Sequence, residues 1–275
     1  TVLDEGGMMM YDPIGGADGT FAMIGVAEKG CADIKFVARS NGGHASTPGK
    51  NTPLVRLGKF MAAAERKNIF EVKIPDTIAE MFRRIAPSMG GALGLVCSHP
   101  RLFAPLIKAV VPGLSATAGA MMRTTIAFTQ QSGSQGANVL PQEASLTVNM
   151  RYIPHQDKEE SIAVIRRIAS RYDLEVEDMG GDSSFAPVNT EGEAFKMVED
   201  VIADVFPGLP VIPYVMTGGT DAAYYQRICD ACIRFSPVLY GPEQMDSMHA
   251  LNENVDTVSL PGAVDFYKAV IRKIQ

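Results

Sequence analysis

One histidine near the end of the chain has neighbours that suit a metal site. His249 lies in the stretch Met248–Asn254, and Asn252 and Glu253 follow it closely. Imidazole binds zinc well, and carboxylates nearby can orient the ring or join the coordination. A single histidine in a loop is also a common surface or capping residue, so this pattern needs support from elsewhere in the chain.

Other stretches supply that support, because each combines glycine or proline with a polar side chain. They are Leu3–Gly7, Gly42–Ser46, Asn138–Pro141 and Thr217–Tyr225. Taken together with Met248–Asn254, they resemble the zinc aminopeptidase, carboxypeptidase and aminoacylase family of co-catalytic metallohydrolases, the M20 type. The resemblance covers the chain from Leu3 to Ile274.

The resemblance implies roles for particular residues. Glu5 and His249 would be ligands of zinc or a similar divalent ion, in a site that holds two zinc ions when it is complete. His44 would be catalytic, reaching the oxyanion of the tetrahedral intermediate, often from the partner subunit. The substrate would be bound by Asn138 and Arg151, which hold its carboxylate, and by the turn Gly218, Gly219 and Thr220.

Two of these roles compete with ordinary structural ones. Arg151 falls on the polar side of an expected strand, where a charge is usually solvated. Asn138 precedes a turn that contains Pro141, and asparagine is common in turns. Against this, an arginine side chain is well suited to grip a carboxylate with two parallel hydrogen bonds.

Several parts of such a site have no match in the sequence. The family also uses an upstream histidine, a bridging aspartate, a further glutamate ligand and a glutamate general base, and all four would precede Thr1. The chain opens on Thr1–Gly7, which has the pattern of a strand already under way, so we expect residues upstream of Thr1 to be missing. Because two-metal hydrolysis needs both ions and a base, the chain as given is expected to bind metal poorly and to be inactive.

The amino-acid composition of the chain argues against some classes of binding partner. The chain has 275 residues, of which 46% are hydrophobic, so it is long enough for two domains with apolar cores. A formal net charge of −6 and the lack of a long basic run argue against a nucleic-acid partner. No stretch has the apolar length of a membrane span, so we expect no membrane partner. A cytoplasmic location is a separate expectation.

The order of expected elements indicates one domain interrupted by another. We predict an α/β zinc-hydrolase domain at 1–31 and 181–275, with a mainly parallel sheet, and an α+β lid at 32–180. Without a helical insertion at about 68–123, the lid has the order β-α-β-β-α-β, which is the ferredoxin-like split unit. The insertion and the opening Asp-Glu-Gly-Gly look most like the carboxypeptidase S and N-acyl-amino-acid synthase/hydrolase branch.

Hydrophobic periodicity places the main elements of the lid. Pro53 begins a helix that runs to about Lys67, and Leu146, Val148 and Met150 alternate with polar residues along the strand Ala144–Tyr152. Asp157 is the expected N-cap of a helix that reaches Tyr172. The glycine-rich stretch Gly180–Ser184 is expected to be a hinge between the domains.

The sequence therefore predicts a metal-dependent hydrolase of an amide bond next to a free carboxylate. Its substrate would be a small peptide or an N-acyl amino acid, and a homodimer would form through the lid. The alternative is a non-catalytic, ferredoxin-like module for dimerisation or ligand binding. Metal content separates the two, because about two zinc ions per chain in the full-length protein support the enzyme and none supports the module.

Overall fold

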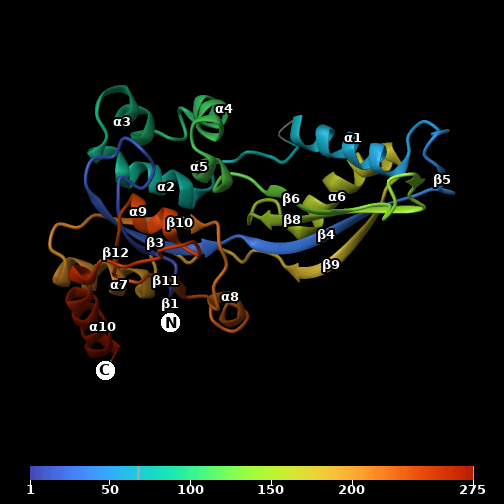
Figure 1. Cartoon of the computed structure of the whole chain (residues 1–275). Coiled ribbons are helices and arrows are strands. Elements are labelled where there is room, and N and C mark those ends of the chain that lie inside the picture. Colours follow the sequence, from blue (N-terminus) through green and yellow to red (C-terminus); the bar gives the residue numbers. More distant parts are fainter. Residues whose placement is uncertain (67–68, 275) are drawn as a thin grey trace. The chain divides into compact units, whose positions relative to one another are not determined.

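The computed structural model describes residues 1–66 and 69–274 of the chain (Figure 1). These residues form two compact units, each assembled from segments that are distant in the sequence. Unit 1 takes residues 1–29, 73–122 and 185–275, and unit 2 takes residues 30–72 and 123–184. The expected end of a helix at Lys67 and the expected start of the insertion at Asn68 lie outside the described residues.

Unit 1 is built on a six-stranded mixed sheet. The strand order is β1-β11-β3-β2-β12, and β10 pairs with β3. Three pairs are parallel (β1 with β11, β10 with β3, β12 with β2) and two are antiparallel (β11 and β2, each with β3). The strands are β1 (Val2–Asp4), β2 (Met8–Tyr11), β3 (Thr20–Glu28), β10 (Val211–Met216), β11 (Cys232–Arg234) and β12 (Leu239–Tyr240).

The described strands of unit 1 form a mainly parallel sheet, as the sequence predicted, but β3 also has two antiparallel neighbours. A glycine-containing loop joins β2 to β3 directly, and strands joined in this way pair antiparallel. The alternation of strands and helices that suggested a parallel sheet occurs only after residue 190. Strands from the start of the chain therefore add antiparallel neighbours that the later pattern does not reveal.

The helical segment expected in the lid groups with unit 1 instead. Helix α2 packs on strand β10 and buries Ile78, Met81, Phe82 and Ile85. Arg84 of α2 also forms an ion pair with Glu199 of α7, and its Nη1 lies 2.5 Å from Glu199 Oε1. The helices of this unit are α2 (Asp76–Ile85), α3 (Gly91–Ser98), α4 (Ala104–Leu114), α5 (Ala116–Ala120), α7 (Glu193–Val205), α8 (Ala222–Tyr225), α9 (Pro242–Ser247) and α10 (Leu260–Ile274), with 3-10 turns at Ala86–Ser88 and Thr257–Ser259.

Unit 2 is a four-stranded antiparallel sheet with the order β6-β8-β4-β9. Its strands are β4 (Gly30–Arg39), β6 (Thr125–Ser132), β8 (Glu143–Tyr152) and β9 (Glu175–Asp182). Two helices, α1 (Pro53–Arg66) and α6 (Lys158–Ala169), pack on it, and a 3-10 turn follows at Ser170–Tyr172. A separate two-stranded ribbon joins β5 (Gly43–His44) to β7 (Val139–Leu140).

The residues that form the core of unit 2 match the predicted periodicity. Leu146, Val148 and Met150 are all buried, as a strand with one face on a core requires. Phe60 of α1 packs on Phe36 of β4 with ring centroids 4.3 Å apart. The predicted cap of α6 is present, since the amide of Glu160 donates to Asp157 Oδ1 at 3.0 Å.

The expected hinge at Gly180–Ser184 begins as strand. Gly180, Gly181 and Asp182 are the last residues of β9, and Gly181 pairs with Ala32 of β4. Gly181 has a φ of +104°, and a Cβ at this position would lie 2.1 Å from the carbonyl oxygen of Cys31. Glycine is therefore required here for close backbone approach. No helix in the described part of the chain is both long and apolar enough to cross a membrane.

Candidate functional site

The backbone around Glu5 is fixed on both sides. Asp4 Oδ2 accepts a hydrogen bond from the amide of Ala222 at 2.6 Å, and Asp4 Oδ1 accepts one from the amide of Glu5 at 2.9 Å. The hydroxyl of Tyr214 donates to the carbonyl oxygen of Gly6 at 2.7 Å. The side chain of Glu5 is itself exposed. The carboxylate of Glu5 thus stands on a restrained segment of unit 1 and is accessible.

The glycine turn that follows β10 is restrained at one end. Gly218 and Gly219 are exposed, and a Cβ on either would meet no other described atom within 4 Å. Thr220 is half-buried, and both its amide and its hydroxyl donate to Glu28 Oε2, at 3.0 and 2.8 Å. Ala222, whose amide donates to Asp4, follows directly. Hydrogen bonds therefore connect this turn to the segment that carries Glu5.

His249 lies in the turn after α9 and is exposed. Its φ of +58° is in the left-handed region, which is uncommon for a residue other than glycine. The donor types of Glu5 and His249, a carboxylate oxygen and an imidazole nitrogen, suit zinc. Two such side chains do not complete a site, and among residues 1–66 and 69–274 no three or more His, Cys, Asp or Glu residues are grouped to hold an ion.

In unit 2, His44 and Asn138 are brought together by the short ribbon. His44 pairs with Val139, and the amide of Ala45 donates to the carbonyl oxygen of Asn138 at 2.9 Å. The ring Nδ1 of His44 lies 2.8 Å from Ser46 Oγ. Both predicted site residues are exposed. This ribbon could not be predicted from the sequence, because strands of two residues are too short to show any periodicity.

Arg151 stands apart from that pair. It lies near the end of β8, eight residues after Glu143, which corresponds to about 27 Å along an antiparallel strand. Asn138 precedes the start of the same strand. Within one copy of the chain, the structure therefore separates Arg151 from His44 and Asn138, although the resemblance assigned Asn138 and Arg151 to one substrate carboxylate.

Arg151 is oriented by a chain of two polar side chains, Asn149 and Asp33, which were not among the predicted site residues. Its Nε donates to Asn149 Oδ1 at 2.9 Å, and Asn149 Nδ2 donates to Asp33 Oδ1 at 2.8 Å. No ion pair of Arg151 is among those formed by the described residues. The alternation in β8 placed Asn149 on the same face as Arg151, and this was the available signal.

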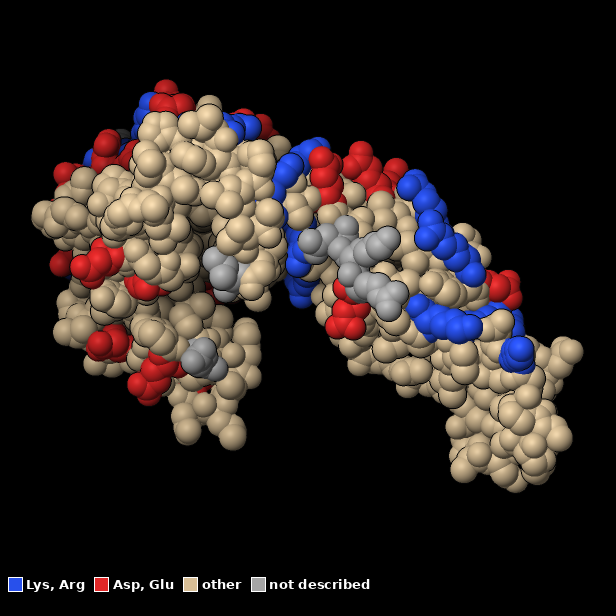
Figure 2. Space-filling view, turned by 90° about the horizontal axis from the view of Figure 1, so that it is seen from above, with Lys and Arg blue, Asp and Glu red and all other residues tan. Residues whose placement is uncertain are grey.

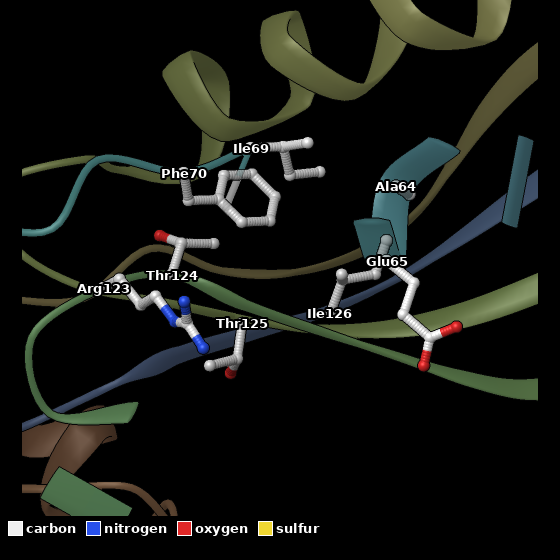
Figure 3. A pocket seen from close by; sticks show the side chains of 8 residues that line it. All are labelled: Ala64, Glu65, Ile69, Phe70, Arg123, Thr124, Thr125 and Ile126. Atoms are coloured by element: carbon white, nitrogen blue, oxygen red, sulfur yellow. The ribbon is translucent and has the colours of Figure 1, made fainter. Parts of the chain in front are cut away.

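The described part of unit 2 contains pockets near the ribbon and beside helix α1. A hollow of about 260 Å³ borders the ribbon and is lined by Gly42, Gly43, Val139 and neighbouring residues. A second pocket of about 180 Å³ has charged Arg123 and Glu65 on opposite sides of apolar Ile69, Phe70 and Ile126 (Figure 3). None of the predicted site residues lines the second pocket.

Comparison with known proteins covers nearly the whole chain. The sequence pattern of Peptidase family M20/M25/M40 matches residues 5–273. The chain is 28% identical over 275 residues to the N-fatty-acyl-amino acid synthase/hydrolase of Xenopus tropicalis, covering 98% of this chain and 53% of that protein. It is 27% identical over 276 residues to the probable carboxypeptidase S-like 2 of Dictyostelium discoideum, covering 100% of this chain and 53% of that protein.

Solved structures share the fold at low sequence identity. The M20 family metallo-carboxypeptidase Sso-CP2 from Sulfolobus solfataricus matches with a TM-score of 0.58 at 13% identity, over 91% of this chain and 59% of that one. The dipeptidase Dug1p from Saccharomyces cerevisiae matches with a TM-score of 0.58 at 12% identity, over 91% and 55%. The chain spans about half the length of the curated relatives it matches.

The hydrogen bond of Tyr214 gives a testable prediction about stability. Burial raises the pKa of the Tyr214 hydroxyl above its usual value near 10. The folded state therefore keeps this proton at a pH where the unfolded state loses it, so the contribution is full below about pH 10 and is lost as the pH rises further. We expect Tyr214→Phe to lower the free energy of unfolding at pH 7 by about 1 kcal/mol, and to make its decline above pH 10 less steep.

The control for that experiment is Tyr224→Phe, because Tyr224 is 67% exposed. Urea unfolding of both variants between pH 7 and 11 is the measurement. Equal stabilities and equal pH slopes for the two variants would show that the Tyr214–Gly6 hydrogen bond does not restrain the segment around Glu5.

Proposed function

The chain belongs to Peptidase family M20/M25/M40, and from this membership we propose that the intact protein is a metal-dependent hydrolase of an amide bond next to a free carboxylate. The observation that carries the proposal is the family match over residues 5–273. The curated relatives named above are named for the two candidate activities, one as an N-fatty-acyl-amino acid synthase/hydrolase and the other as a probable carboxypeptidase S-like protein. Both reactions release a product with a free carboxylate.

The metal-binding part of the proposal concerns unit 1. Glu5 and His249 would each supply one ligand to zinc in a two-metal site, and both side chains are exposed. Zinc bound there would polarise the scissile carbonyl group. The hydrogen bonds of Asp4 and Tyr214 would hold the Glu5 backbone in place, so that little conformational freedom is lost when an ion binds.

Replacement of His249 tests the metal proposal. In the intact protein, His249→Ala should reduce bound zinc by one ion per chain and lower kcat by several orders of magnitude, because a Lewis acid contributes several kcal/mol to the transition state. Metal analysis after dialysis and initial rates are the measurements. Unchanged metal content and rate would make His249 an ordinary loop residue. If the wild-type protein holds no metal and hydrolyses nothing, the alternative of a non-catalytic module is favoured.

The substrate-binding part of the proposal concerns unit 2, which we propose to be a ferredoxin-like lid. Its β-α-β-β-α-β chain order and the sheet order β6-β8-β4-β9 support this. Arg151 would grip the substrate carboxylate. The hydrogen bond from its Nε to Asn149 leaves its two terminal nitrogens for the carboxylate, and Asn149 is in turn held by Asp33. Such a chain orients the guanidinium before substrate arrives.

Carboxylate recognition is tested with paired substrates. Wild-type protein should reject a substrate whose carboxylate is replaced by an amide, whereas Arg151→Lys and Arg151→Ala should hardly distinguish the two. Loss of the two-pronged contact should cost about 2–4 kcal/mol in kcat/KM for the acid substrate, because an ammonium group cannot reproduce the fork. A panel of dipeptides and N-acyl amino acids then identifies the class. Equal turnover of acid and amide by wild type would refute the role of Arg151.

The separation along β8 supports a homodimer. His44 and Asn138 are near one end of this strand and Arg151 is near the other, about 27 Å away. One small substrate cannot contact both ends of the same copy. If all three residues act on one substrate, two copies of the chain must contribute, with one copy providing Arg151 and the other providing His44 and Asn138. We propose that unit 2 mediates this pairing.

Mixing two inactive variants tests the shared site. We expect His44→Ala and Arg151→Ala each to be nearly inactive as homodimers. After the two are unfolded and refolded together, about a quarter of wild-type activity should return, because half of the molecules are then mixed dimers and each has one intact site. The matched control is either variant refolded with itself. No recovery in a mixture that contains dimers would mean that each site is built from a single copy.

A further inference from the structure

A buried ion pair in unit 1 reaches the turn that was proposed to line the substrate site. We infer that Glu28 is a positioning residue, which holds the turn Gly218–Thr220 in its substrate-binding conformation, and that Arg234 holds Glu28. This inference rests on the proposed function, together with the substrate-binding role that the resemblance implies for the turn. Neither Glu28 nor Arg234 was singled out by the sequence patterns.

Most of the hydrogen bonds that the Glu28 carboxylate accepts come from the turn. Glu28 is the last residue of β3 and is only 4% exposed. Its Oε2 accepts three hydrogen bonds, from the amide of Thr220 at 3.0 Å, from the hydroxyl of Thr220 at 2.8 Å and from Arg234 Nε at 3.3 Å. Two of the three donors thus belong to one residue of the turn.

Arg234 is held on all sides within the sheet. It is completely buried, with 0% exposure. Besides the contact with Glu28, its Nη1 donates to the carbonyl oxygen of Cys232 at 2.7 Å and its Nη2 donates to Gln226 Oε1 at 2.6 Å. The guanidinium therefore has a fixed position, and it provides the positive charge that a buried carboxylate needs.

A buried ion pair of this kind is poorly explained by stability alone. Removing two charges from water is costly, and apolar residues of similar size would often stabilise the fold equally well. What an apolar pair cannot do is accept two hydrogen bonds from Thr220. The geometry of the pair is therefore better matched to fixing the turn than to filling the core.

The turn has few other restraints. Gly218 and Gly219 are exposed, and glycine has more backbone freedom than any other residue. On the far side of Thr220, the amide of Ala222 donates to Asp4, which precedes Glu5. Thr220 is the point where the buried network holds the turn, so its hydroxyl contact can be removed without breaking the ion pair beneath it.

The decisive variant is Thr220→Val, which deletes the hydroxyl but keeps the Glu28–Arg234 pair. The matched control is Thr190→Val, because the hydroxyl of half-buried Thr190 also donates to a glutamate, Glu80 Oε2 at 3.2 Å, outside the candidate site. Thr220→Ser tests rescue, since serine retains the hydroxyl. Amide hydrogen exchange of the segment 216–222 and steady-state kinetics are measured on the intact protein.

We expect Thr220→Val to exchange faster in segment 216–222 and to raise KM about five- to tenfold with a much smaller change in kcat, because a loosened turn binds substrate less well. Thr220→Ser should recover most of both effects, and Thr190→Val should show neither. A second variant, Glu28→Gln, should also speed exchange of this segment, provided that its thermal unfolding remains cooperative.

Each other outcome has a distinct meaning. Exchange that is unchanged in both Thr220→Val and Glu28→Gln overturns the inference, because the turn is then held by something other than the hydrogen bonds that Thr220 donates to Glu28. Faster exchange with an unchanged KM also overturns it, because the turn is then restrained but plays no part in binding substrate. If the wild-type protein hydrolyses no peptide or N-acyl amino acid, the proposed function itself fails, and the exchange data show separately whether Glu28 restrains the turn.

Discussion

Strand β3 is the element on which unit 1 depends. All of its residues after Thr20 are buried, and it pairs with β10, β11 and β2. A strand with neighbours on both sides satisfies its backbone hydrogen bonds only when each neighbour is in register. The segment carrying Glu5 precedes β2, and the turn Gly218–Thr220 follows β10. The register of β3 therefore determines where both parts of the candidate site lie.

The elements that could be predicted from sequence are those whose residues alternate or repeat locally. The buried face of β8, the helix that begins at Pro53 and the cap at Asp157 all follow from a few consecutive side chains. The grouping of helix α2 with unit 1 could not be predicted in this way. Its apolar face is equally compatible with either unit, and only its packing on β10, far along the chain, decides between them.

The candidate site shows the same limit. Short polar stretches identified residues of the right chemical type, and the proximity of His44 to Asn138 depends on a ribbon too short to leave a pattern. Spacing along the sequence also concealed the distance between Asn138 and Arg151. Thirteen positions apart in the chain, they are separated by nearly the full length of an extended strand. Asn149, Glu28 and Arg234, which hold residues of the candidate site, are polar residues on strands, where the default interpretation is a solvated surface side chain.

The interleaved composition of the two units affects how the protein emerges from the ribosome. All of unit 2 has been synthesised once residue 184 is made. In contrast, Ala22 of β3 can pair with Val211 of β10 only after a further 27 residues have been added. Until then, a nearly continuous apolar strand lacks a parallel neighbour, and closing so long a loop is slow. An exposed strand of this kind can pair with other nascent chains. During synthesis, unit 1 should therefore be the part that depends on chaperones, while unit 2 folds beside it unaided.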